Sequence, residues 1–189
     1  DIYSVFLGTN DWWQGRPIGT LDDYINDTGS TTLFGAYRII LDKLKALNES
    51  ARIILITPMQ RGDFVYIADM KNNAYGSYQD KNGQNLAQFA AAIIEIAKYE
   101  ELESIDLYNA SGITQETMVK YKRLKDPATG EYRNYSYPDY IGIPFNPGGD
   151  EYPYPPEAID MTYDGLHPSD KGYDVIASML LETLQPPAP

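Results

Sequence analysis

The chain has 189 residues, 43% of them hydrophobic, which is enough for one globular domain with a sizeable core and argues against a disordered chain. Its formal net charge of -12 opposes binding to nucleic acid phosphates. The absence of cysteine excludes disulfides, thiolate metal sites and a cysteine nucleophile.

Strands and helices alternate along the first part of the chain. Residues 2–7 form a continuous apolar run that ends at a glycine, which is typical of a buried parallel strand. A polar, glycine-rich loop is expected to about residue 30, and apolar residues at helical spacing predict a helix over roughly 31–48. The run at 52–57 predicts a second buried strand, which Pro58 ends.

The later elements follow the same alternation. Residues 58–82 show little pattern and are expected to be a long connection. Helices are predicted over about 85–100 and 114–124, with a short strand at 104–108 between them. Ser169 is placed to cap a final helix. The buried face of that helix would include four residues: Tyr173, Ile176, Leu180 and Leu184.

This order of elements predicts a three-layer α/β/α fold, with a parallel sheet covered by helices on both faces. We expect residues 1–185 to form one domain that carries insertions at about 58–82 and 126–162. The second insertion is rich in Tyr, Pro and Gly, and is either a functional loop or a mobile insertion. The tail at 186–189 is expected to leave the domain because its prolines cannot extend a helix.

The first motif with chemical meaning is Gly8-Thr9-Asn10-Asp11, directly after the first strand. Ligands collect at the carboxyl ends of the strands in an open parallel sheet, where the Asn10 amide could donate to a developing oxyanion. Local turn hydrogen bonds are the alternative, and this motif alone favours them. Trp12 and Trp13 follow directly. We expect that at least one of them lines the substrate cleft, and the alternative is that both pack in the core.

The second motif is Asp164-Gly165-Leu166-His167-Pro168, ahead of the last helix. His167 is the only histidine, so imidazole acid–base chemistry would have to use it. The spacing lets Asp164 accept a hydrogen bond from one ring nitrogen while the other faces a cleft. Taken alone, this motif is more often a surface histidine beside an aspartate. One histidine and no cysteine argue against a zinc site, and no metal or cofactor is expected.

Together and in this order, the two motifs resemble those of the SGNH (GDSL-like) hydrolases, a family of esterases and lipases. Residues 1–11 look like the third conserved block of that family, and residues 163–168 look like its fifth. The resemblance implies a flavodoxin-like SGNH hydrolase fold. It also implies that Asn10 donates in the oxyanion hole, that His167 is the general base and later the acid, and that Asp164 orients His167.

The same resemblance places the family's nucleophilic serine ahead of the first motif. None of the nine serines stands in a matching context: Ser4, Ser30, Ser50, Ser77, Ser104, Ser111, Ser136, Ser169 and Ser178. We therefore expect a missing N-terminal segment and little or no esterase activity from this chain alone. The strand at 2–7 would then be an exposed apolar edge, covered by the missing segment as a separate piece or by a second copy of the chain.

Three classes of function stay open: an SGNH-type serine esterase, a catalytically inactive relative that binds glycans through aromatic loops, and a structural or interaction domain. For the esterase we favour an acetylated carbohydrate over a long-chain lipid as the substrate, because the loops are aromatic and polar. A secreted or periplasmic location is slightly favoured. No apolar stretch approaches the length that a membrane span requires.

Overall fold

The computed structural model describes residues 1–185, so the predicted tail at 186–189 lies outside the described residues. The chain divides into two compact units. The first unit contains Asp1–Met59, Asp80–Ser111 and the chain from Met179 onward, and the second contains Gln60–Gln79 and Gly112–Ser178. Within residues 1–185, none of the helices is both long and apolar enough to cross a membrane.

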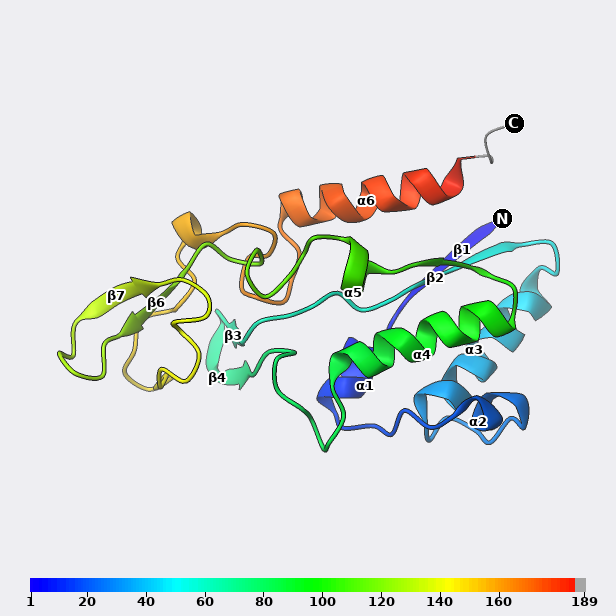
Figure 1. The fold of residues 1–189 in the computed structure, drawn as a ribbon, viewed down its shortest axis with the longest axis horizontal. Helices are drawn as coiled ribbons and strands as arrows, with labels where there is room; N and C mark the ends of the chain where they lie inside the picture. Colours follow the sequence, from blue (N-terminus) through cyan, green and yellow to red (C-terminus); the bar gives the residue numbers. More distant parts are fainter. Residues whose placement is uncertain (186–189) are drawn as a thin grey trace. The chain divides into compact units, whose positions relative to one another are not determined.

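A parallel sheet of three strands forms the centre of the first unit, in the order β1-β2-β5 (Figure 1). The strands are β1 (Ile2–Phe6), β2 (Arg52–Ile56) and β5 (Glu103–Ile105). The middle strand, β2, buries Ile54 and Leu55 completely, as its continuous apolar run predicts.

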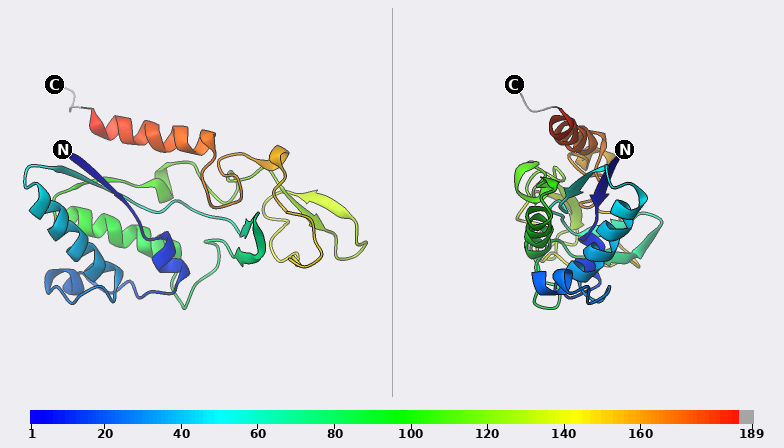
Figure 2. Two further views of the ribbon diagram at one scale, coloured as in Figure 1. Left: turned by 180° about the vertical axis from the view of Figure 1, so that it is seen from behind. Right: turned by 90° about the vertical axis from the view of Figure 1, so that its right-hand side faces the viewer.

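Helices cover this sheet. The helices that lie wholly in the first unit are α1 (Thr9–Trp13), α2 (Leu21–Ile25), α3 (Leu33–Leu47), α4 (Leu86–Tyr99) and α5 (Leu107–Ala110). The two long ones, α3 and α4, begin at side-chain caps: the Thr32 hydroxyl accepts from the Gly35 N–H, and the Asn85 side chain accepts from the Gln88 N–H. The sheet lies between these two helices and the last turns of α6 (Asp170–Leu184), which gives the three expected layers (Figures 1 and 2).

The start of α6 agrees with the prediction, but its predicted buried face does not. The Ser169 hydroxyl accepts from the Gly172 N–H at 3.3 Å and caps the helix. Tyr173 is exposed, and the other three residues predicted for the buried face are only half-buried. The buried residue is Gly172, because its lack of a side chain lets the helix backbone approach the Met161 carbonyl. A close backbone contact at one end thus replaces the expected apolar stripe.

The second unit is built on two antiparallel hairpins. One pairs β3 (Phe64–Tyr66) with β4 (Asp69–Ala74), and the other pairs β6 (Lys122–Lys125) with β7 (Tyr132–Tyr135). A short 3-10 helix, η1, covers Pro156–Ala158. One cluster of buried residues in this unit contains Val65, Met118, Val119 and Tyr154.

The predicted helix at 114–124 is wrong. The Met118 N–H donates to the Thr114 carbonyl, so one helical turn does form, but the turn does not continue. The chain instead enters β6, where buried Lys122 and Leu124 alternate with half-buried neighbours. This period of two is that of a strand, and pairing with β7 stabilises it.

The two expected insertions contain regular structure. Residues 58–82 hold the β3–β4 hairpin, and residues 126–162 hold β7 and η1. Within the latter, Tyr140 and Tyr154 are buried and each lies edge-to-face against another tyrosine of the segment. This burial favours an ordered segment that packs its own rings, and its role as a functional loop stays a prediction.

Candidate active site

The turn after β1 positions Asn10 at the carboxyl end of the sheet. Gly8, the N-cap of α1, has a φ of +113°, and a Cβ there would lie 3.2 Å from both Pro58 and Ile93. Glycine therefore allows the chain to turn at once from β1 into α1. Asn10 is the second residue of α1 and is exposed, so its amide is free to meet a ligand from solvent.

The two tryptophans that follow have different environments. Trp12 is fully buried, and its indole N–H donates to the Gln84 carbonyl at 2.9 Å. This agrees with the core-packing alternative for Trp12. Trp13 is half-buried, and the Lys81 ammonium lies 4.9 Å from the centre of its ring. Trp13 is thus the more accessible of the two, and its role in substrate binding stays a prediction.

In the second unit, Asp164 holds both the backbone and the ring of His167. One carboxylate oxygen accepts from the backbone N–H groups of Leu166 (3.0 Å) and His167 (2.8 Å). The other lies 2.8 Å from the imidazole Nδ1 of His167. Because a carboxylate only accepts, the neutral ring carries its proton on Nδ1, and Nε2 is left as the basic nitrogen. The His167 side chain is 59% exposed, so Nε2 is accessible.

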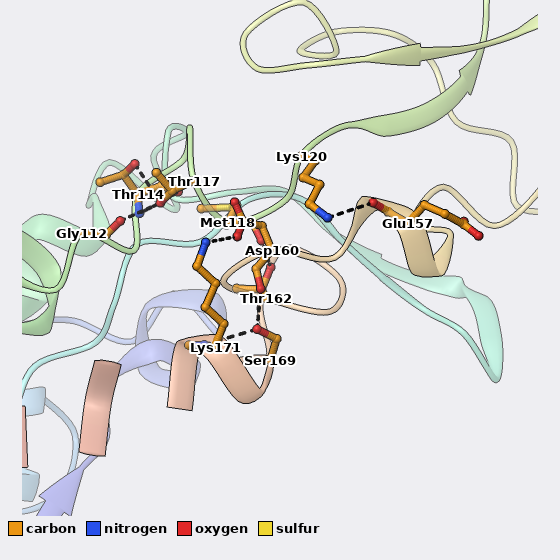
Figure 3. A network of polar contacts seen from close by, with 11 residues as sticks. Gly112, Thr114, Thr117, Met118, Lys120, Glu157, Asp160, Thr162, Ser169 and Lys171 are labelled. Atoms are coloured by element: carbon orange, nitrogen blue, oxygen red, sulfur yellow. Dashed lines mark hydrogen bonds and ion pairs between the residues drawn. The ribbon is translucent and has the colours of Figure 1, made fainter. Parts of the chain in front are cut away.

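Buried polar contacts fix the turn that carries these two residues. Gly165 has a φ of +85°, and its N–H donates to the hydroxyl of Thr162 at 2.9 Å. Thr162 is fully buried and donates in turn to the Met118 carbonyl. On the other side of the turn, Ser169 donates to the Asp160 carbonyl (Figure 3). The turn is therefore anchored on both sides before it presents the imidazole.

A segment from the first expected insertion also contacts this turn. The Gly62 N–H donates to the Gly165 carbonyl at 2.7 Å. The ring of Phe64 meets the His167 ring edge-to-face, with 5.2 Å between their centres. Sequence reasoning missed this segment because about a hundred positions separate it from the motif and it carries no recognisable pattern.

Arg61 adds a positive charge to the same region, and it too was missed. Its side chain is buried, and burial lowers the pKa of the guanidinium to about 10. The negative charges of Asp164 and Asp63 oppose that shift, so the group remains a cation at neutral pH.

Asn10 belongs to the first unit and the Asp164–His167 pair to the second. Their convergence on one pocket therefore stays a prediction. Within residues 1–185, no group of three or more histidine or acidic side chains is arranged to hold a metal ion. The chemistry available in the second unit is that of a carboxylate-oriented base.

Several serine hydroxyls are engaged in structural hydrogen bonds. Those of Ser111 and Ser178 donate to carbonyls four residues back in the chain. Ser77 donates to the Arg61 carbonyl, and Ser169 caps α6. None of these contacts is the pairing with an imidazole that activates a serine nucleophile.

Comparisons with known proteins give one consistent result. A model of the GDSL-like Lipase/Acylhydrolase family matches residues 1–175. The structure of a possible lipase from Chitinophaga pinensis DSM 2588 is 61% identical and superposes with a TM-score of 0.95. The match covers 96% of this chain and 71% of that one.

Two more distant structures share the fold. A protein from Lactobacillus plantarum is 21% identical with a TM-score of 0.61, over 97% of this chain and 66% of that one. A further solved structure is 22% identical with a TM-score of 0.63, over 97% and 64% of the two chains. The present chain thus spans slightly less than two thirds of the length of each of these two structures. Among curated proteins, none matches the chain.

Proposed function

Because this chain belongs to the GDSL-like lipase/acylhydrolase family, we propose that it carries the acid–base half of a serine ester hydrolase. His167 is the general base, Asp164 orients it, and Asn10 donates a hydrogen bond to the oxyanion. The observation that carries this assignment is the 2.8 Å contact between the Asp164 carboxylate and Nδ1 of the only histidine.

In this proposal Nε2 of His167 takes the proton of a serine hydroxyl as the serine oxygen attacks the ester carbonyl. The Asn10 amide stabilises the oxyanion that develops on the carbonyl oxygen. The imidazolium then gives its proton to the leaving alcohol, and water hydrolyses the acyl-enzyme by the same steps. Asp164 stabilises the transient positive charge on the ring throughout.

The nucleophile in this proposal lies outside the present sequence. The structural hydrogen bonds of Ser77, Ser111, Ser169 and Ser178 support this view. The 189-residue chain alone should then have little or no esterase activity. For the substrate we propose an acetylated carbohydrate, with Trp13 as a candidate surface for the sugar. A second proposal is a catalytically inactive glycan-binding domain, which the exposed aromatic surface of the chain would also serve.

The test is hydrolysis of a small chromogenic acetate ester. The protein with all residues that its gene encodes is compared with His167→Ala and Asn10→Ala. We expect His167→Ala to lose activity on the order of a thousandfold, as for other members of a catalytic triad. Loss of one oxyanion donor in Asn10→Ala should cost about a hundredfold or more in kcat.

Tyr173→Phe is a suitable control, because Tyr173 is an exposed side chain six positions beyond His167. Equal rates for the unchanged protein and His167→Ala would refute the catalytic assignment. Retained binding of acetylated glycans with no hydrolysis would favour the second proposal. Rapid turnover by the 189-residue chain alone would contradict a nucleophile outside it.

A further inference from the structure

Asp63, in the second unit, accepts hydrogen bonds through both its carboxylate and its backbone carbonyl. One carboxylate oxygen accepts from the Gly76 N–H at 2.9 Å and from the Tyr78 hydroxyl. The other pairs with the Lys122 ammonium at 2.7 Å. The backbone carbonyl of Asp63 accepts from the Tyr154 hydroxyl. Four residues of the unit thus fix both the side chain and the backbone of Asp63.

Lys122 is enclosed on its other sides by aromatic rings. Its side chain is 6% exposed, and its ammonium lies 4.6 Å from the ring centre of Tyr140 and 5.4 Å from that of Tyr154. Burial lowers the pKa of Lys122, and the charge of Asp63 opposes that shift. The ammonium is buried while the Asp63 side chain is 29% exposed, so water competes for the ion pair only from the carboxylate side.

The chain around Asp63 bears directly on the turn that carries His167. A Cβ on Gly165 would collide with the Asp63 carbonyl oxygen, so the two backbones are in contact. The residue before Asp63 donates to the Gly165 carbonyl, and the residue after it, Phe64, packs its ring against His167. A displacement of Asp63 would therefore move both the backbone that contacts Gly165 and the Phe64 ring that packs against His167.

We propose that Asp63 and Lys122 are positioning residues for His167: their partly buried ion pair holds residues 62–64 where these residues fix the Gly165 turn and the imidazole. The inference rests on the proposed function, because it assigns His167 as the base. Neither residue touches the reacting atoms. Their effect passes through the Gly62–Gly165 hydrogen bond and the Phe64–His167 ring contact.

Overall stability alone explains such a pair poorly. Replacing a buried ion pair by apolar side chains of similar volume is often neutral or stabilising, since the desolvation of two charges offsets their attraction. A pair that holds a backbone segment in one place can instead affect the reaction rate, because it fixes the position of a catalytic group. A misplacement of a catalytic group by about 1 Å can cost on the order of a hundredfold in rate.

The experiment uses the protein as its gene encodes it, isotope-labelled at the histidine nitrogens. The signal of His167 is identified as the one lost in His167→Gln. The variants are Lys122→Met, Lys122→Arg and Tyr78→Phe, and the matched control is Lys125→Met. Lys125 lies on the same strand, pairs with Asp150 at 3.0 Å and stacks on the Tyr132 ring, but it does not reach residues 62–64.

In the unchanged protein, NMR should show the proton of the neutral imidazole on Nδ1. In Lys122→Met we expect a mixture of the two tautomers and a kcat reduced on the order of tenfold or more, with KM changed by less than about twofold. Lys122→Arg should retain most of the Nδ1 tautomer and most of kcat. Lys125→Met should change neither the tautomer nor kcat. If Lys122→Met does not fold, Tyr78→Phe, which removes one donor to Asp63, decides by the same readouts.

The positioning role of Asp63 and Lys122 and the proposed hydrolase function can be refuted separately. A tautomer shift in Lys122→Met with no ester hydrolysis by the unchanged protein would keep the positioning role and reject the proposed function. An unchanged tautomer in both Lys122→Met and Tyr78→Phe would overturn the positioning role, whatever happens to the melting temperature.

Discussion

At the scale of single residues, Glu100 connects three helices of the first unit through one carboxylate. It follows directly after α4, accepts a hydrogen bond from the Tyr24 hydroxyl of α2 at 2.7 Å, and forms an ion pair with Lys45 of α3. Burial alone would raise the pKa of Glu100, but the hydrogen bonds from Lys45 and Tyr24 outweigh it and the pKa is lowered.

This residue predicts a pH dependence of stability. Because folding lowers the pKa of Glu100, its contribution to the free energy of unfolding is complete above the ordinary value of 4.5 and is lost as the pH falls through the folded value. Glu100→Gln should cost about 2 kcal/mol at neutral pH. The two proteins should converge on acidification, as urea unfolding at several pH values would measure. Glu95→Gln, at an exposed position on the same helix, is the control; a constant difference at all pH values would contradict the assignment.

The candidate site was predictable only where its residues are close in sequence. Asp164 and His167 are three positions apart, and the predicted contact between carboxylate and imidazole is present. Arg61, Asp63 and Phe64 lie about a hundred positions away from that motif. They act through packing and charge, which leave no spacing pattern, so reading the sequence could not find them.

At the scale of elements, Arg52 fastens the end of α6 to the sheet. Its guanidinium donates to the carbonyls of Thr183 and Leu184 and also pairs with Glu103 on the neighbouring strand. Carbonyls at the end of a helix have no partner within it, and a cation there also meets the negative end of the helix dipole. One side chain thus provides both a cap and a link between layers.

Arg52→Met should therefore loosen the last turn of α6. We expect amide hydrogen exchange at residues 181–184 to become about tenfold faster, as for a local loss of one or two charge-assisted hydrogen bonds. Arg38→Met, which removes an exposed ion pair with Asp42 inside α3, should leave that exchange unchanged. Equal exchange in both variants would show that other contacts hold the helix end.

Long elements with a clear period were predictable, and short ones were not. The helices α3 and α4 and the strands β1 and β2 lie within a few residues of their predicted bounds. The five-residue helices α1 and α2 were missed because they are too short to display a helical period. The hairpins β3–β4 and β6–β7 depend on a partner strand, so local sequence could not indicate them.

At the scale of the whole molecule, β1 stands at an edge of the sheet. Among residues 1–185 its only paired neighbour is β2. Ile2 is 53% exposed and Phe6 is 42% exposed. An apolar edge with unpaired backbone groups is a template for another strand. We propose that a further segment of polypeptide or a second copy of the chain covers it.

The 189-residue chain should accordingly associate as its concentration rises. Introducing charges with Ile2→Lys and Phe6→Lys should weaken that association by about tenfold or more, because lysine at an edge opposes strand pairing. Sedimentation velocity measures the effect, and intact-mass analysis shows whether another polypeptide copurifies. Ile67→Lys, at an exposed position between β3 and β4 in the second unit, is the control. A chain that stays monomeric at every concentration and binds no additional polypeptide would contradict the proposal.

The enclosure of Lys122 has a practical consequence for following how the protein opens. Trypsin must draw a lysine into its own specificity pocket before it cuts, and the Lys122 side chain is only 6% exposed. Cleavage after this lysine requires its strand to leave the tyrosine rings, whereas the exposed Lys71 and Lys171 lack that protection. The rate at which the peptide ending at Lys122 appears therefore measures the local unfolding around this residue. A digest sampled over minutes would give this rate without any added label.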